Sequence, residues 1–237
     1  MKTLAITLAF AAGLTAASVQ KDFQKKDVDI KAPDGVTLKG AYFSARRRGP
    51  AILLIHQCNM DRHAWDGLAG DLAAGGINVL TYDTRGFGES GGTKAERQKW
   101  PGDVDAAYEY LLKEKGVDAS RIAVGGASCG VTMSSDLAAR RPEIHALLIL
   151  SGIASDAARE HITSDTSLAV FGAASAGDSR AAQGIREAEG ASKNPKSMLK
   201  IYEGTEHGVP MFAKHPELEP MIVAWLKTEL SAPGGTR

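Results

Sequence analysis

Short apolar runs alternate with segments rich in helix formers through most of the chain after residue 50. Each apolar run has the length of a buried strand, and each intervening segment has the length of a helix. Continuous apolar strands that alternate with helices are typical of an α/β fold, in which helices cover both faces of a mainly parallel sheet. The predicted strands are 51–55, 77–82, 121–124, 146–150, 168–171 and 198–202, and the predicted helices are 61–74, 103–115, 129–140, 154–161, 179–189 and 217–230.

The part of the chain before these units has a different pattern. Residues 28–31 and 36–43 alternate apolar and polar side chains on either side of Pro33-Asp34-Gly35. Two alternating runs around a turn sequence predict a β-hairpin, which would add an antiparallel edge to the sheet. The length of 237 residues suits one core, so we expect a single domain over residues 19–230 and a flexible tail at 231–237.

The first residues resemble a secretory signal peptide. Met1-Lys2 is followed by an apolar run at 3–14, which is too short to span a bilayer comfortably, and then by the small residues Ala16, Ala17 and Ser18. We therefore predict a signal peptide at residues 1–18 and a secreted or periplasmic protein without stable membrane insertion. The alternative is an N-terminal anchor that stays attached.

The charges are balanced, with 28 Lys and Arg against 28 Asp and Glu. No overall positive field therefore favours nucleic acid as a partner, and long-range charge is not expected to recruit the substrate. The same balance gives no overall field that favours acidic membranes.

Residues 126–130 form a Gly-x-Ser-x-Gly sequence between a predicted strand and a predicted helix. This is the pattern of a nucleophile elbow, a sharp turn that exposes a serine hydroxyl. Gly126 and Gly130 are needed because the two backbones approach closely. Ser128 is the candidate nucleophile, and the backbone N–H of Cys129 is a candidate oxyanion donor. The alternative is a glycine-rich turn that only happens to contain a serine.

A serine nucleophile needs a base, and the base needs an acid that orients it. In an α/β sheet such residues come directly after the strands, at their carboxyl ends. His207, which follows strand 198–202, is the candidate base, and Asp178, which follows strand 168–171, is the candidate acid. Asp156 is the alternative acid. His56 ends a strand before the nucleophile and is expected to shape its own loop.

The second oxyanion donor is expected in the loop after strand 51–55. The backbone N–H of Cys58 is the first candidate, and that of Gln57 is the second. If both cysteines flank the oxyanion hole, they could form a disulfide in an oxidising compartment and so fix the two donors of the hole. The alternative, which we expect, is that Cys58 and Cys129 are two small residues packed in a crowded loop.

Several motifs together resemble the α/β-hydrolase superfamily, particularly its compact dienelactone-hydrolase-like members, over residues 28–230. The resemblance rests on 53–56, 83–90, 117–122, 177–178 and 204–208. It implies an α/β-hydrolase fold in which the loop 83–90 is structural. The short segment after strand 146–150 implies that no cap domain covers the site. The chain departs from the pattern at Gln57, where many relatives have glycine, and at Ser128, where dienelactone hydrolases have cysteine, which argues against dienelactone specificity.

The residues and the resemblance together predict a serine hydrolase that cleaves carboxylic ester or thioester bonds of small acyl substrates. The chemistry requires no metal or organic cofactor. Within enzymes, the alternative is a small amidase or peptidase with the same triad. Outside enzymes, the alternative is a non-catalytic hydrolase-like binding protein, which would be expected to have lost a triad residue.

Overall fold

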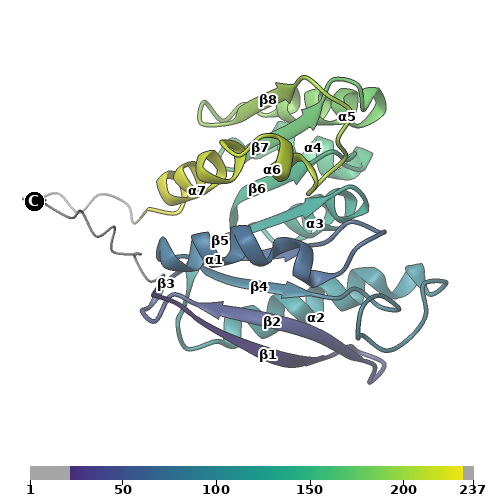
Figure 1. The fold of residues 1–237 in the computed structure, drawn as a ribbon, viewed down its shortest axis with the longest axis vertical. Helices are drawn as coiled ribbons and strands as arrows, with labels where there is room; N and C mark the ends of the chain where they lie inside the picture. Colours follow the sequence, from purple (N-terminus) through teal and green to yellow (C-terminus); the bar gives the residue numbers. More distant parts are fainter. Residues whose placement is uncertain (1–21, 232–237) are drawn as a thin grey trace, which may run out of the picture.

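The computed structural model describes residues 22–231, so the predicted signal peptide and nearly all of the predicted tail lie outside the described residues. Eight strands form one sheet in the order β1-β2-β4-β3-β5-β6-β7-β8 (Figure 1). The strands are β1 Gln24–Lys31, β2 Thr37–Ser44, β3 Gly49–Ile55, β4 Asn78–Tyr82, β5 Val117–Ala127, β6 Ile144–Leu150, β7 Ala169–Ser175 and β8 Met198–Tyr202.

The predicted hairpin and the predicted parallel sheet are both present. β1 pairs antiparallel with β2, and β2 pairs antiparallel with β4. All pairs from β4 through β3 to β8 are parallel, so their carboxyl ends meet at one edge of the sheet (Figure 1). The fold is therefore the predicted α/β-hydrolase fold, and every strand that precedes a candidate site residue ends at that edge.

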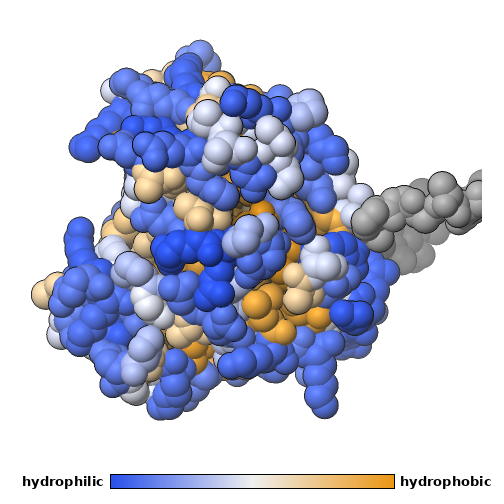
Figure 2. Space-filling view, turned by 180° about the vertical axis from the view of Figure 1, so that it is seen from behind, coloured by the Kyte–Doolittle hydropathy of each residue, from blue (hydrophilic) through white to orange (hydrophobic). Residues whose placement is uncertain are grey.

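Helices cover both faces of the sheet, as expected for a sheet whose parallel strands are apolar on both sides. α1, α6 and α7 pack on one face, and α2, α3, α4 and α5 pack on the other. Figure 2 views the molecule from the α2–α5 side and shows a largely hydrophilic surface with small apolar patches. The helices are α1 Asp66–Ala74, α2 Trp100–Lys113, α3 Cys129–Arg140, α4 Asp156–Ser164, α5 Ser179–Ala191, α6 Met211–Lys214 and α7 Leu218–Glu229.

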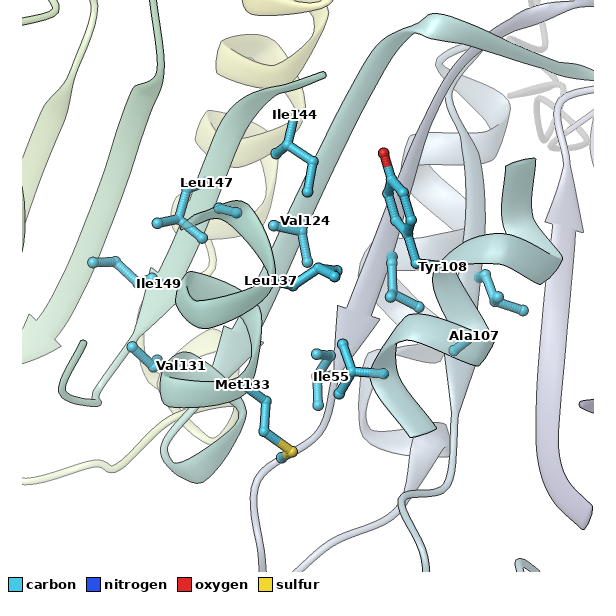
Figure 3. Packing of buried hydrophobic residues seen from close by; sticks show 14 of the residues in the cluster. Ile55, Ala107, Tyr108, Val124, Val131, Met133, Leu137, Ile144, Leu147 and Ile149 are labelled. Carbon is cyan, nitrogen blue, oxygen red and sulfur yellow. The ribbon is translucent and has the colours of Figure 1, made fainter. Parts of the chain in front are cut away.

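The helix that follows the candidate nucleophile is anchored in the core. Val131 and Leu137 of α3 are fully buried and lie against β5 and β6, where Val124 and Ile149 are also fully buried (Figure 3). Full burial of each such side chain stabilises the fold by about 1.5–3 kcal/mol. This packing fixes the first turn of α3, and with it the backbone beside Ser128.

Several boundaries differ from the sequence-based prediction for local reasons. The predicted helix 61–74 divides into a 3-10 turn, Arg62–Trp65, and α1, because the Asp61 side chain caps the turn by accepting from the His63 N–H. β5 begins at Val117, earlier than predicted, where it pairs with Gly49 before the register shifts. The short helix α6 was not predicted, since four residues are too few for a periodic pattern.

The connection between β6 and β7 is short. Residues 151–168 contain one helix, α4, so no cap domain is inserted there, as predicted. In the described part of the chain, no helix combines enough length with enough apolar character to cross a membrane.

Candidate active site

The candidate nucleophile lies at the junction of β5 and α3. Ser128 has φ 53° and ψ −118°, a conformation that residues with a side chain rarely adopt. Its N–H donates to the Leu150 carbonyl at the end of β6, and its carbonyl accepts from the Val131 N–H, at 2.9 and 3.0 Å. These bonds hold the backbone of Ser128 on both sides, so the surrounding fold maintains the strained turn of a nucleophile elbow.

The glycines on either side of Ser128 are required by close backbone contact, as the sequence predicts. A Cβ at Gly126 would lie 2.1 Å from the carbonyl oxygen of Gly130. A Cβ at Gly130 would lie 2.4 Å from the carbonyl oxygen of Ile55, at the end of β3. The elbow is thus pressed against the end of β3, where the loop with the second candidate oxyanion donor begins.

His207 lies in the loop after β8, and its side chain meets Ser128. Nε2 of His207 is 2.7 Å from the Ser128 Oγ, which is the distance of a hydrogen bond. The side chain of His207 is 44% exposed, so the imidazole is accessible from solvent. With a proton on Nδ1, Nε2 is free to accept the hydroxyl proton of Ser128.

Asp178 lies directly before α5 and orients that imidazole. Its Oδ2 is 2.5 Å from Nδ1 of His207. Two backbone bonds hold the loops together: the Ala176 N–H donates to the Tyr202 carbonyl at 2.7 Å, and the Gly177 N–H donates to the Gly204 carbonyl at 2.8 Å. The structure therefore brings Ser128, His207 and Asp178 into one hydrogen-bonded row, in the order that the sequence predicts.

The alternative acid lies elsewhere. Asp156 is in the first turn of α4, its side chain is 90% exposed, and its carboxylate pairs with Arg159. Asp83, at the end of β4, is fully buried and pairs with Arg62, while its carboxylate also accepts from the Glu89 N–H at 2.9 Å. These contacts give the Asp83 loop the structural role that the resemblance implies.

His56 shapes the loop after β3. Its ring is buried, Nδ1 lies 2.8 Å from the Gln57 carbonyl, and Nε2 accepts from the Thr84 N–H at 3.0 Å. Burial lowers the pKa of His56 below its ordinary value, because a charged imidazole loses its hydration there. Through the bond from the Thr84 N–H, the ring ties the β3 loop to the end of β4.

The two cysteines form a disulfide. The Cα atoms of Cys58 and Cys129 are 5.9 Å apart, within the usual range, and the bond joins the β3 loop to the first residue of α3. Our expectation of two packed free thiols is thus wrong, because the contact between β3 and the elbow brings the cysteines closer than sequence spacing reveals. The α-helix begins at Cys129, so its N–H has no acceptor within the helix.

Gln57 has a role that we did not predict. Its side-chain Oε1 accepts from the Val209 N–H at 2.9 Å, and its Nε2 donates to the Asn59 Oδ1 at 2.8 Å. Gly208 has φ +70°, and a Cβ there would lie 2.2 Å from the Gln57 Oε1. The side chain therefore connects the β3 loop to the loop that presents His207. The chain's departure from glycine at this position was the signal that could have pointed to it.

A cavity of about 250 Å³ opens beside the candidate nucleophile. Its wall combines the hydrogen-bonded row with the start of α3, the segment after β6 and the start of α5. The lining residues are Ser128, Cys129, Thr132, Ser151, Gly152, Ile153, Asp178, Arg180, Ala181 and His207. Thr132, Ile153 and Arg180 were not predicted, since their place depends on how the helices pack around the strand ends. The cavity lies next to the serine hydroxyl.

Comparison with known families gives a match over most of the domain. The family model described as "Serine aminopeptidase, S33" matches residues 47–205, which is more than half of the 237-residue chain. The matched segment includes Ser128 and Asp178 and ends two residues before His207.

Curated relatives match only part of their own length. An uncharacterized protein of Mycobacterium tuberculosis is 37% identical over 119 residues, which are 49% of this chain and 42% of that protein. The thiohydrolase apmlB of Arthrinium phaeospermum is 31% identical over 121 residues, 49% of this chain and 39% of that protein. This chain thus spans less than half of the length of either relative.

Solved structures share the fold. The esterase Pf2001 of Pyrococcus furiosus superimposes with a TM-score of 0.71 at 19% identity, covering 89% of this chain and 93% of that chain. A predicted CIB-like hydrolase of Thermoplasma acidophilum has a TM-score of 0.70 at 16% identity, covering 87% of this chain and 99% of that chain. The narrower likeness to dienelactone hydrolases stays a prediction. The chain has the fold of the α/β-hydrolase superfamily and belongs to the family described as serine aminopeptidase, S33.

Proposed function

We propose that this protein hydrolyses carboxylic ester or thioester bonds through an acyl-enzyme on Ser128. The observation that carries the proposal is the row of hydrogen bonds from the Ser128 Oγ through His207 to Asp178, at 2.7 and 2.5 Å. A hydroxyl, an imidazole and a carboxylate in this order are the parts that acyl transfer needs. An intact row also argues against a non-catalytic binding protein.

The reaction follows from what each group can do. Ser128 Oγ attacks the acyl carbonyl, and its proton passes to Nε2 of His207. The negative charge on the carbonyl oxygen is stabilised by the backbone N–H groups of Cys129 and Cys58. Collapse of this intermediate expels the alcohol or thiol, which takes the proton from His207. Water then attacks the acyl-enzyme by the same route and releases the carboxylic acid, while Asp178 stays ionised and holds the imidazole in place.

The type of bond that is cleaved is a more specific proposal than the acyl-enzyme mechanism itself. Thioester cleavage is supported by the name of the relative from Arthrinium phaeospermum, a thiohydrolase, and ester cleavage by the name of the fold neighbour Pf2001. The second candidate is amide or peptide hydrolysis, which the name of the matching family favours. A panel of p-nitrophenyl esters, matched thioesters and aminoacyl p-nitroanilides would separate the two, since only an amidase turns over the anilides.

The catalytic assignment is tested by a matched pair of variants. Asp178→Asn keeps the shape of the side chain but favours the wrong tautomer of His207, so kcat should fall by about 10⁴-fold. Asp156→Asn is the control, in the connection between β6 and β7. Its kcat should stay within about twofold of the wild type, because substitutions of exposed residues away from the core and the site change little. If Asp156→Asn loses activity and Asp178→Asn keeps it, the assignment is wrong.

Covalent labelling tests the nucleophile itself. A fluorophosphonate should modify Ser128, as mapped by peptide mass spectrometry, and Ser128→Ala should abolish the labelling. A protein that binds acyl compounds without cleaving them would remain unlabelled.

We further propose that residues 1–18 are a signal peptide and that the mature protein works outside the cytoplasm. The disulfide between Cys58 and Cys129 supports this location, since such bonds persist in oxidising compartments. N-terminal sequencing of the protein exported by its host would test it, with Val19 as the expected first residue.

A further inference from the structure

The disulfide joins the two backbone segments that are proposed to stabilise the oxyanion. Cys129 follows the nucleophile directly and is fixed by the packing of α3, whereas Cys58 lies in the turn after β3. The bond therefore runs from a rigid element to a loop. A cross-link of this kind restricts the loop much more than the helix.

Cys58 packs partly buried against the hydrophobic core, but few hydrogen bonds fix its backbone. The turn around it is closed by a bond from the Met60 N–H to the Gln57 carbonyl at 3.0 Å. The neighbouring side chains of His56 and Gln57 are held by Thr84 and by the loop after His207. Across residues 22–231, however, the backbone N–H and C=O of Cys58 take part in no hydrogen bond. The N–H is thus unoccupied by protein acceptors, and the disulfide is the covalent constraint on where it lies.

We propose that the Cys58–Cys129 disulfide is a positioning element for catalysis, which holds the Cys58 N–H beside that of Cys129 so that both reach the oxyanion. The inference rests on the proposed function. Oxyanion stabilisation requires donors within about 2.7–3.1 Å of the oxygen. A turn that is released from α3 samples positions outside this range, so the second donor is lost for part of the time.

The dependence on oxidation follows from the chemistry of the bond. A dithiol such as dithiothreitol breaks the S–S bond, transfers two electrons and two protons to give the thiols of Cys58 and Cys129, and is itself oxidised to its cyclic disulfide. Loss of one oxyanion donor lowers kcat by about 10²–10³-fold. Because a loosened donor is displaced rather than removed, we expect kcat to fall by about 10- to 100-fold, with KM changed by less than about threefold.

A cross-link that only stabilises the fold would behave differently. It would increase the fraction of folded protein without changing the turnover of each folded molecule. The measurement therefore has to be normalised to folded, reactive sites, by circular dichroism and by titration with a fluorophosphonate. It also needs a readout of the oxyanion hole itself, for which we choose the inhibition constant of a phenylboronic acid that forms a tetrahedral adduct with Ser128.

The experiment compares the oxidised protein, the protein reduced with dithiothreitol and the double variant Cys58→Ala/Cys129→Ala, with a p-nitrophenyl ester as substrate. Reduction and the double variant should lower kcat to the same extent and weaken boronic acid inhibition by a similar factor. Dithiothreitol should have no effect on the double variant. Should reduction unfold the protein, the double variant, which carries no thiols, provides the same comparison.

The inference is overturned if folded protein without the disulfide has a kcat and an inhibition constant for the phenylboronic acid that are within about twofold of those of the oxidised protein. Failure of the proposed function gives a different result. In that case the oxidised protein itself neither hydrolyses the ester nor reacts with the fluorophosphonate, and the inference is refuted with it.

Discussion

His56 should make the stability of the fold depend on pH on the acidic side of neutrality. Its side chain is buried, with the residue only 1% exposed, and both ring nitrogens are engaged. Nε2 accepts from the Thr84 N–H at 3.0 Å, and Nδ1 donates to the Gln57 carbonyl at 2.8 Å. A second proton on the ring would point at the Thr84 N–H. Protonation of His56 is therefore disfavoured in the folded protein by geometry as well as by burial.

The charges around the ring do not reverse this preference. Burial lowers the pKa of His56 most strongly, and Lys94 adds to that effect. The bond to the Gln57 carbonyl and the carboxylates of Asp83 and Asp61 act in the opposite direction, but the pKa remains below its ordinary value. The unfolded chain then binds a proton that the folded protein does not bind, once the pH falls below the ordinary histidine pKa of about 6.5.

The sign and size of the effect follow from this linkage. Stability is lost as pH falls below about 6.5, and the loss continues until the pH reaches the pKa that His56 has in the folded protein. One proton contributes about 1.4 kcal/mol for each pH unit, so the free energy of unfolding should decrease by up to about 2 kcal/mol between pH 6.5 and pH 5. Urea unfolding at a series of pH values measures this change.

The variant His56→Gln isolates the contribution of the ring. It keeps an acceptor for the Thr84 N–H but cannot titrate, so other groups contribute equally to both proteins. The wild type should lose up to about 2 kcal/mol more than the variant over the same pH range. Parallel pH profiles for the two proteins would refute the reasoning.

Two further predictions concern the elbow and the loop that presents the base. Gly126→Ala should cost about 1–3 kcal/mol, because the new Cβ would overlap the backbone carbonyl of Gly130. The control is Gly190→Ala on α5, where nothing lies within 4 Å of the added Cβ, and it should stabilise the fold by up to about 1 kcal/mol. If urea unfolding gives the two variants equal stability, this explanation is wrong. Gln57→Met keeps the length of the side chain but leaves the buried N–H of Val209 without its acceptor, so unfolding should become easier by about 1–3 kcal/mol. The same variant should lower kcat because the loop with His207 loses its connection to the β3 loop, and unchanged stability and kcat would exclude that role.

The sequence was informative wherever one local rule determines the geometry. The elbow could be predicted because a strand that turns directly into a helix tolerates only small residues beside the nucleophile, as at Gly126. His207 and Asp178 could be predicted because parallel strands deliver the residues that follow them to one edge of the sheet. Asp156 satisfies the same rule, and only the structure distinguishes it, through its exposure and its pairing with Arg159.

The features that could not be predicted depend on distances between segments far apart in the chain. Cys58 and Cys129 are separated by 71 positions, and their pairing depends on how closely the β3 loop approaches α3. The contact of Gln57 with the loop after His207 has the same origin. Thr132 and Arg180 reach the cavity because α3 and α5 begin at the ends of β5 and β7, which lie on either side of β6, and no sequence pattern marks a residue for that position.

The brevity of the β6–β7 connection has a consequence for how such a protein can diversify. This segment borders the cavity through Gly152 and Ile153 but carries none of the three residues in the hydrogen-bonded row. A longer β6–β7 connection would cover the pocket and change which molecules enter it. Ser128, His207 and Asp178 would keep their positions, because they follow other strands. Under the proposed function, the segment that borders the pocket is separate from the residues that react, so residues 151–168 are the place to insert a segment that changes substrate specificity.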